Sequence, residues 1–176
     1  ATPLQHPVIV YEEFTGNTAA INSVALEARV QGFLEAINYV DGARVSKGTV
    51  LFNIQRDQYQ AQLDLNKAQL AMAVAKQTNA QAEYNRQATL GKQDFASQRA
   101  VDDAKTNLDS ATAQIAADKA NIDLATITLG YTSVTAPFDG VVTRHLADVG
   151  ALVGYSGPTK LATIVQIDPI YVYFNI

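Results

Sequence analysis

The chain has 176 residues, a formal net charge of −4 and a sequence pI near 5.0, and it contains no cysteine. This length allows one ordinary domain or two small ones. The acidic balance argues against nucleic-acid binding, because no basic stripe is present to meet phosphates. The lack of cysteine excludes disulfides, thiolate metal sites and a cysteine nucleophile. No apolar run approaches the roughly 20 residues that span a bilayer, so we expect any membrane anchor to lie outside this sequence.

The first 54 residues favour β-structure. The run Val8–Tyr11 within Pro7–Ala20 predicts a strand that leads into a turn at Glu12–Gly16. From Ile21 to Ile54 the apolar residues are largely β-branched and are separated by regularly placed glycines. These glycines are Gly32, Gly42 and Gly48. We expect short strands separated by glycine turns in this segment.

The stretch from about Asp57 to about Ala125 contains no proline and is rich in Ala, Gln, Asn, Lys and Asp. We interpret it as two long helices joined by one tight turn between Gly91 and Ser97. In the second arm, apolar and small residues form a heptad pattern, with Asp118 as the polar exception. The heptad positions are Val101, Ala104, Leu108, Ala111, Ile115, Ile122, Ala125 and Leu129.

The first arm repeats this pattern less regularly. Its seven-residue phase contains Leu63, Leu70 and Tyr84. Gln77 interrupts the phase, and Ala73, Val74 and Ala80 lie beside it. Small seam residues let two helices approach closely. At 1.5 Å per residue, an arm of roughly 33 residues is about 50 Å long, so it must project from a small domain.

The β pattern before the helices returns after them. The matched positions are Gly32 with Gly140, Gly42–Val45 with Gly150–Val153, and Leu51–Ile54 with Leu161–Ile164. An internal repeat predicts two similar halves that pack on each other to bury one core. Beyond it, apolar residues alternate from Ile170 to Ile176, which predicts a strand with one strongly apolar face. Val8–Tyr11 is one candidate partner for that strand, so the two terminal segments are expected to pair.

The two β segments resemble the halves of a biotinyl/lipoyl domain. Val40–Ile54 is similar to the first half, and Thr135–Val142 followed by Val149–Val153 is similar to the second. Carrier domains of that family present a modified lysine after an aspartate at the hairpin between the halves. Here Gln58 follows Asp57, so the resemblance implies that no lipoyl or biotinyl cofactor is attached at that site.

A lipoyl-like domain split by a helical hairpin resembles the periplasmic adaptors, or membrane-fusion proteins, of RND-type tripartite multidrug efflux pumps. Leu129–Gly140 and Ile167–Val172 carry the family's signatures. The resemblance implies an α+β fold: a split biotinyl/lipoyl-like β domain, an inserted antiparallel α-helical hairpin forming a coiled coil, and terminal strands of a truncated β-barrel. The expected parts are barrel strands at 1–20 and 168–176, lipoyl-like halves at 21–56 and 130–167, and the hairpin at 57–129.

The same resemblance implies a non-enzymatic periplasmic subunit, tethered to the inner membrane by an N-terminal anchor absent from this sequence. It would form a ring of six copies and join an inner-membrane RND transporter to an outer-membrane TolC-like channel. Two alternatives stay open: an adaptor of an ABC-type or metal exporter, and a lipoyl or biotinyl carrier domain with a helical insertion. No catalytic or metal site is indicated, because His6 and His145 are far apart and Ser156 lacks nucleophile-elbow spacing.

Arg86, Leu90 and Ser97 have the spacing with which RND adaptors meet the outer-membrane channel, around the turn residue Gly91. The resemblance therefore implies that these residues dock the channel at the hairpin tip. An arginine can bind carbonyls or carboxylates, and a leucine can fill a small apolar pocket. Each residue also has a simpler interpretation. An arginine on a polar helix face is usually solvated, Leu90 can close the hairpin, and Ser97, like Asp94, can cap the second helix.

Overall fold

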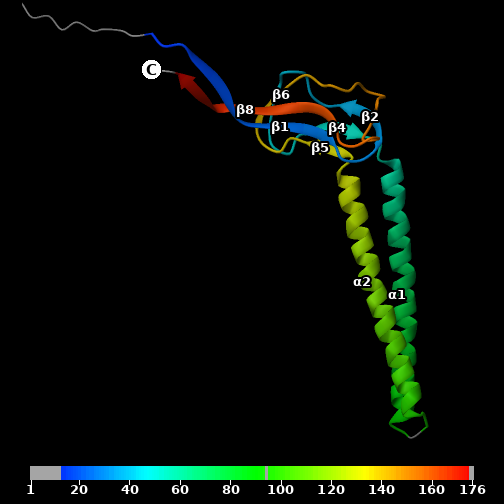
Figure 1. Cartoon of the computed structure of the whole chain (residues 1–176). Helices are drawn as coiled ribbons and strands as arrows, with labels where there is room; N and C mark the ends of the chain where they lie inside the picture. The colour runs from blue at the N-terminus through cyan, green and yellow to red at the C-terminus, as the bar shows by residue number, and fades with distance from the viewer. Residues whose placement is uncertain (1–12, 94, 175–176) are drawn as a thin grey trace, which may run out of the picture.

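The computed structural model describes residues 13–93 and 95–174. It consists of a small β body and a long helical rod that projects from it (Figure 1). The rod contains α1 (Asp57–Gly91) and α2 (Gln98–Gly130), while the strands precede and follow this pair in sequence. The predicted α+β fold with an inserted antiparallel hairpin is therefore confirmed.

Within residues 13–93 and 95–174, eight strands build the body as two four-stranded sheets. The strands are β1 (Gly16–Ala28), β2 (Gly32–Ile37), β3 (Arg44–Val45), β4 (Val50–Ile54), β5 (Ser133–Thr135), β6 (Gly140–Val142), β7 (Leu152–Val153) and β8 (Thr159–Phe174). One sheet has the order β1-β8-β6-β3 and the other β5-β4-β2-β7. All pairings within both sheets are antiparallel.

The internal repeat is visible in the pairing of the strands. By their matched positions, β2, β3 and β4 of the first half correspond to β6, β7 and β8 of the second. The short strand β3 pairs with β6, and its counterpart β7 pairs with β2, so each half donates one strand to the other half's sheet. This exchange confirms that two similar halves pack on each other, and it explains why neither half can bury its apolar face alone.

The core lies between the two sheets and draws on both halves. Its largest fully buried side chains are Phe52, Leu34, Leu51, Ile54, Leu161, Ile164, Val142 and Val153. The repeated segments Leu51–Ile54 and Leu161–Ile164 supply five of these eight residues, which is why the repeat is apolar at these positions. Gly42 and Gly150 occupy matched turns with φ of 78° and 91°, a left-handed conformation that costs glycine least.

The seam of the rod follows the predicted heptads. Every predicted position in α2, including Asp118, is buried or half-buried. In α1 the seam is more continuous than the sequence indicated, because Gln77 is half-buried within it and Asn66 is buried. Of the residues beside the phase, Ala73 is buried, whereas Val74 is 44% exposed.

Strands β1 and β8 extend beyond the body as a two-stranded ribbon (Figure 1). Gly16–Ala20 pairs with Ile170–Phe174, so the terminal strand does find a partner near the other end of the chain. The suggested partner Val8–Tyr11 lies outside the described residues.

The turn expected up to Gly16 was wrong at that residue, which begins β1. The boundaries proposed after residues 20 and 167 fall inside continuous strands, so that division stays a prediction.

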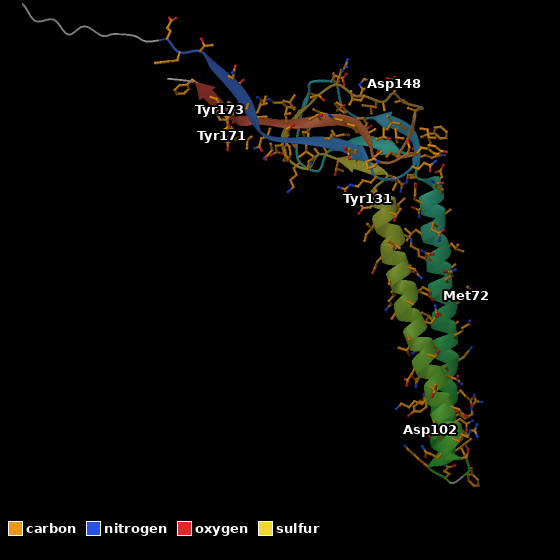
Figure 2. All side chains as sticks on the ribbon, in the orientation of Figure 1. Met72, Asp102, Tyr131, Asp148, Tyr171 and Tyr173 are labelled. Carbon is orange, nitrogen blue, oxygen red and sulfur yellow. The ribbon has the colours of Figure 1, made fainter. Side chains whose placement is uncertain are left out.

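The end of β8 has the predicted apolar face, and this face is exposed. All five residues at this end are exposed: Ile170, Val172 and Phe174 on one face, and Tyr171 and Tyr173 on the other. The two tyrosines are labelled in Figure 2. The alternation seen in the sequence was a true strand signal. Within the part of the chain that the structure describes, both faces of the ribbon's end are exposed.

Candidate functional site at the tip of the hairpin

The two helices meet tightly at the apex of the rod. α1 ends at Gly91, and the Leu90 carbonyl oxygen accepts hydrogen bonds from the backbone N–H groups of Gln93 (3.1 Å) and Phe95 (2.9 Å). A Cβ atom at Gly91 would stand 3.1 Å from a methyl group of Val101 on α2. Gly91 is thus the last helical residue before the turn, and its lack of a side chain lets α2 start close beside α1.

Ser97 begins the second helix as its N-cap. Its Oγ accepts a hydrogen bond from the backbone N–H of Ala100 (3.2 Å), which satisfies one of the free donors of the first turn. The simpler interpretation of Ser97 is therefore confirmed. The other suggested cap, Asp94, lies outside the described residues.

Arg86 lies on α1 one turn before Leu90 and remains accessible. Its Nη1 is 3.2 Å from Glu83 Oε2, and its side chain is 66% exposed. An exposed pair of this kind contributes roughly 0–1 kcal/mol to stability, so it holds the guanidinium only loosely. Leu90 is half-buried. The arginine can exchange its intramolecular partner for a carboxylate or carbonyl of another protein at little cost.

The predicted site residues thus occupy both sides of one apex, but each has its own contacts within the chain. Arg86 pairs with Glu83, the Leu90 carbonyl closes the turn, and Ser97 caps α2. Phe95, which is not among the residues predicted from the sequence, is 79% exposed in the turn. The sequence does contain a signal for this residue. A large apolar side chain in a turn between two polar helix ends is not needed for folding, so it indicates a contact surface.

Two buried polar residues lie inside the rod. Asn66 was not recognised from the sequence, and Asp118 was recognised only as a polar exception to the heptads. Asn66 donates a hydrogen bond to the Asn121 carbonyl on α2 (3.0 Å) and accepts one from Gln62 (3.1 Å). Asp118 is 5% exposed and accepts one from Gln114 (2.9 Å). Counting three residues from Leu63 would have placed Asn66 on the seam. Its bond across the helices specifies their register, as buried polar residues do in coiled coils.

His145 of the second half of the body contacts Asp41 of the first half. Its backbone N–H donates to Asp41 Oδ1 (3.2 Å), and its ring Nδ1 lies 2.9 Å from the same oxygen. Its Nε2 lies 3.4 Å from Asp148 Oδ1. The side-chain hydrogen bond that Asp41 accepts from His145 raises the pKa of His145, and the same bond lowers the pKa of Asp41. Nothing in the sequence around His145 indicates this contact, because Asp41 lies 104 positions away.

This contact makes the stability of the body depend on pH. A raised histidine pKa contributes stability that is complete below its ordinary value of about 6.5 and disappears as pH rises through the folded pKa. The lowered pKa of Asp41 contributes above about 3.8 and is lost as pH falls through its folded value. We expect His145→Gln to lower the melting temperature more at pH 5.5 than at pH 8, as calorimetry can measure. An equal loss at both pH values would contradict this.

Within the described residues, no helix has both the length and the apolar character needed to cross a bilayer. The same residues contain no group of three His, Cys, Asp or Glu side chains arranged to hold a metal ion.

Several known proteins are similar to this chain in sequence or in structure. Efflux pump periplasmic linker BepF of Brucella suis is 42% identical over 172 residues, which cover 97% of this chain and 41% of that protein. Multidrug resistance protein MdtE of Escherichia coli K12 is 36% identical over 165 residues, covering 94% of this chain and 43% of MdtE. The chain thus spans about two-fifths of the length of these relatives.

A solved structure agrees with the sequence relatives. The MacA–MexA chimera that contains the Pseudomonas aeruginosa MexA α-hairpin domain superposes with a TM-score of 0.64 at 27% identity, covering 87% of this chain and 49% of the chimera. The family model described as RND MFP, barrel-sandwich hybrid domain, matches residues 22–166. This match includes the hairpin and nearly all of the body, so the chain belongs to the RND membrane-fusion-protein family.

Proposed function

We propose that this chain is the body and hairpin of a periplasmic adaptor in an RND-type multidrug efflux pump. The observation that carries the proposal is a two-helix rod about 52 Å long that stands out of a barrel-sandwich body. Relatives named as multidrug resistance proteins and efflux pump periplasmic linkers support this role. The adaptor joins an inner-membrane RND transporter to an outer-membrane channel, and its action is mechanical and not enzymatic.

The surface of the rod suits assembly into a conduit. Its small seam residues Ala73, Ala104 and Ala125 are buried, so the helices pack closely and keep a polar exterior. Exposed Leu65, Met72 and Leu124 interrupt that exterior with apolar side chains. Rods lined up side by side in a ring of six copies can bury these residues against a neighbouring copy while the polar remainder stays hydrated.

The tip is the surface that meets the channel. Arg86 supplies an accessible charge and Leu90 a partly exposed apolar group one turn further along α1. Ser97 starts α2 across the turn, and its hydroxyl proton remains available because its oxygen is the atom that accepts from Ala100. Phe95 extends the apolar part of this surface. A partner with a small apolar pocket beside carbonyl or carboxylate oxygens would match this combination.

The position of α1 disfavours the carrier-domain alternative. In the described structure Asp57 and Gln58, where a carrier would present its lysine, form the first turn of a long helix. The Gln58 side chain is directed back to the body, where its Nε2 is 3.4 Å from the Gln31 carbonyl. A swinging prosthetic group needs an exposed turn at this place, and the chain has a rigid helix start instead.

The proposal is tested by placing a photo-cross-linking amino acid at Lys92 in the full-length protein in intact cells. We expect an adduct with an outer-membrane channel protein, because Lys92 is exposed directly after α1. The matched control is Met72, which is 61% exposed at mid-rod and should not reach the channel (Figure 2). Adducts of Lys92 with the subunit's own body or with soluble proteins alone would refute the proposal.

A further inference from the structure

The joint between rod and body is formed by two adjacent chain crossings. The chain leaves the body after Ile54 and returns at Thr132, and the Ile54 N–H donates to the Thr132 carbonyl (2.7 Å). Two crossings held this close together form a narrow attachment. By themselves they permit the rod to tilt about the line that joins them, so a third contact is needed to fix its direction.

The loop between β1 and β2, residues 29–31, supplies a contact with α1. The Gln31 carbonyl oxygen accepts a hydrogen bond from the Tyr59 hydroxyl (2.7 Å) and a longer one from Gln58 Nε2 (3.4 Å). Both donors lie in the first turn of α1. The half-buried Tyr59 ring also packs against the core of the body. Tyr59 therefore links helix, loop and core at one point.

The same loop contacts the end of α2. The Arg29 guanidinium lies 5.3 Å from the centroid of the Tyr131 ring, within cation–π range. Tyr131 directly follows the last residue of α2, where the rod meets the body (Figure 2). A positive charge near a helix C-terminus is also favoured by the helix dipole. One short loop thus touches both helices, beside the two chain crossings.

We propose that the loop 29–31 is a brace that sets the angle between rod and body, with Tyr59 and Arg29 as its positioning residues. The leverage is large, since a rotation of about 10° at the joint moves the tip of a rod about 52 Å long by about 9 Å. Such a displacement exceeds the reach of any side chain at the tip. The consequence for docking rests on the proposed function, whereas the angle itself is a property of this chain alone.

The test measures the distance distribution between spin labels at Val40 on the body and Met72 on the rod, both strongly exposed. We expect one narrow distribution for the wild type and a distribution about twofold wider for the double variant Tyr59→Phe, Arg29→Gln, because two off-axis restraints are removed. Each single variant should widen it partially. Circular dichroism should show unchanged helix content in all of them.

Tyr39→Phe is the matched control, because its hydroxyl donates a comparable bond to the Thr143 carbonyl (3.2 Å) within the body. It should leave the distribution unchanged. The proposed role of the loop 29–31 would be overturned if the distance distribution of the double variant kept its width, or if Tyr39→Phe widened it equally. If the distribution widens but efflux-dependent resistance is retained, the role of the brace in docking is overturned. Failure of tip cross-linking, in contrast, bears on the proposed function and leaves the angle measurement intact.

Discussion

Arg86→Asp in the full-length protein is expected to lower efflux-dependent resistance to the level of a strain that lacks the adaptor. The substitution reverses the charge at the accessible end of α1 and places it beside Glu83, so a carbonyl- or carboxylate-bearing partner is repelled. The rod itself should lose only about 1 kcal/mol or less, because the Glu83 pair is exposed. Resistance is read as the minimum inhibitory concentration, and folding as the melting curve of the purified protein.

Lys67→Asp is the matched control for that experiment. Lys67 forms the same kind of exposed pair, with its Nζ 3.6 Å from Asp64 three residues earlier, but it lies on the half of α1 nearer the body. Its charge reversal should alter stability as little as Arg86→Asp does and should leave resistance intact. Retained resistance in Arg86→Asp, or equal losses in both variants, would show that the tip charge has no specific role.

Ala73→Asp should open the seam of the rod. Ala73 is 5% exposed between the helices, where a carboxylate can be neither hydrated nor paired with a cation. An uncompensated buried charge costs several kcal/mol, so we expect the free energy of unfolding to fall by about 3 kcal/mol or the helices to separate locally. Urea unfolding followed by circular dichroism at 222 nm measures this loss.

Ala75→Asp isolates the effect of burial in the same helix. Ala75 is exposed, so the substitution changes only helix propensity, at a cost of about 0.7 kcal/mol or less. The difference between the two variants in the free energy of unfolding measures how closely α1 and α2 pack at Ala73. Equal destabilisation by both substitutions would mean that α1 and α2 do not pack as described.

The parts of the fold that follow local periodicity were predictable. The heptads of α2 gave its seam position by position, and the repeated glycines and apolar residues predicted two packed halves. The lengths of β1 and β8 were not predictable in this way. Their pairing extends past the body through contacts between residues more than 140 positions apart, with register shifts near Ala20 and Leu26 that no local pattern encodes.

The site was predictable to a smaller degree. Ser97 as a cap followed from its residue type and position, whereas the partners of Arg86 and the exposure of Phe95 depend on how the apex closes. The contacts of Tyr59 with Gln31 and of His145 with Asp41 join segments 28 and 104 positions apart. Such pairs arise from the packing of separate elements, so composition and spacing gave no indication of them.

We expect that the rod must have its full length for the tip to reach its partner. Deleting residues 71–77 from α1 together with residues 111–117 from α2 removes one heptad from each arm, preserves the seam and the tip, and shortens the rod by about 10 Å. We expect a folded, helical protein that no longer supports efflux-dependent resistance and no longer cross-links to the channel from Lys92. Full resistance with the shortened rod would contradict it.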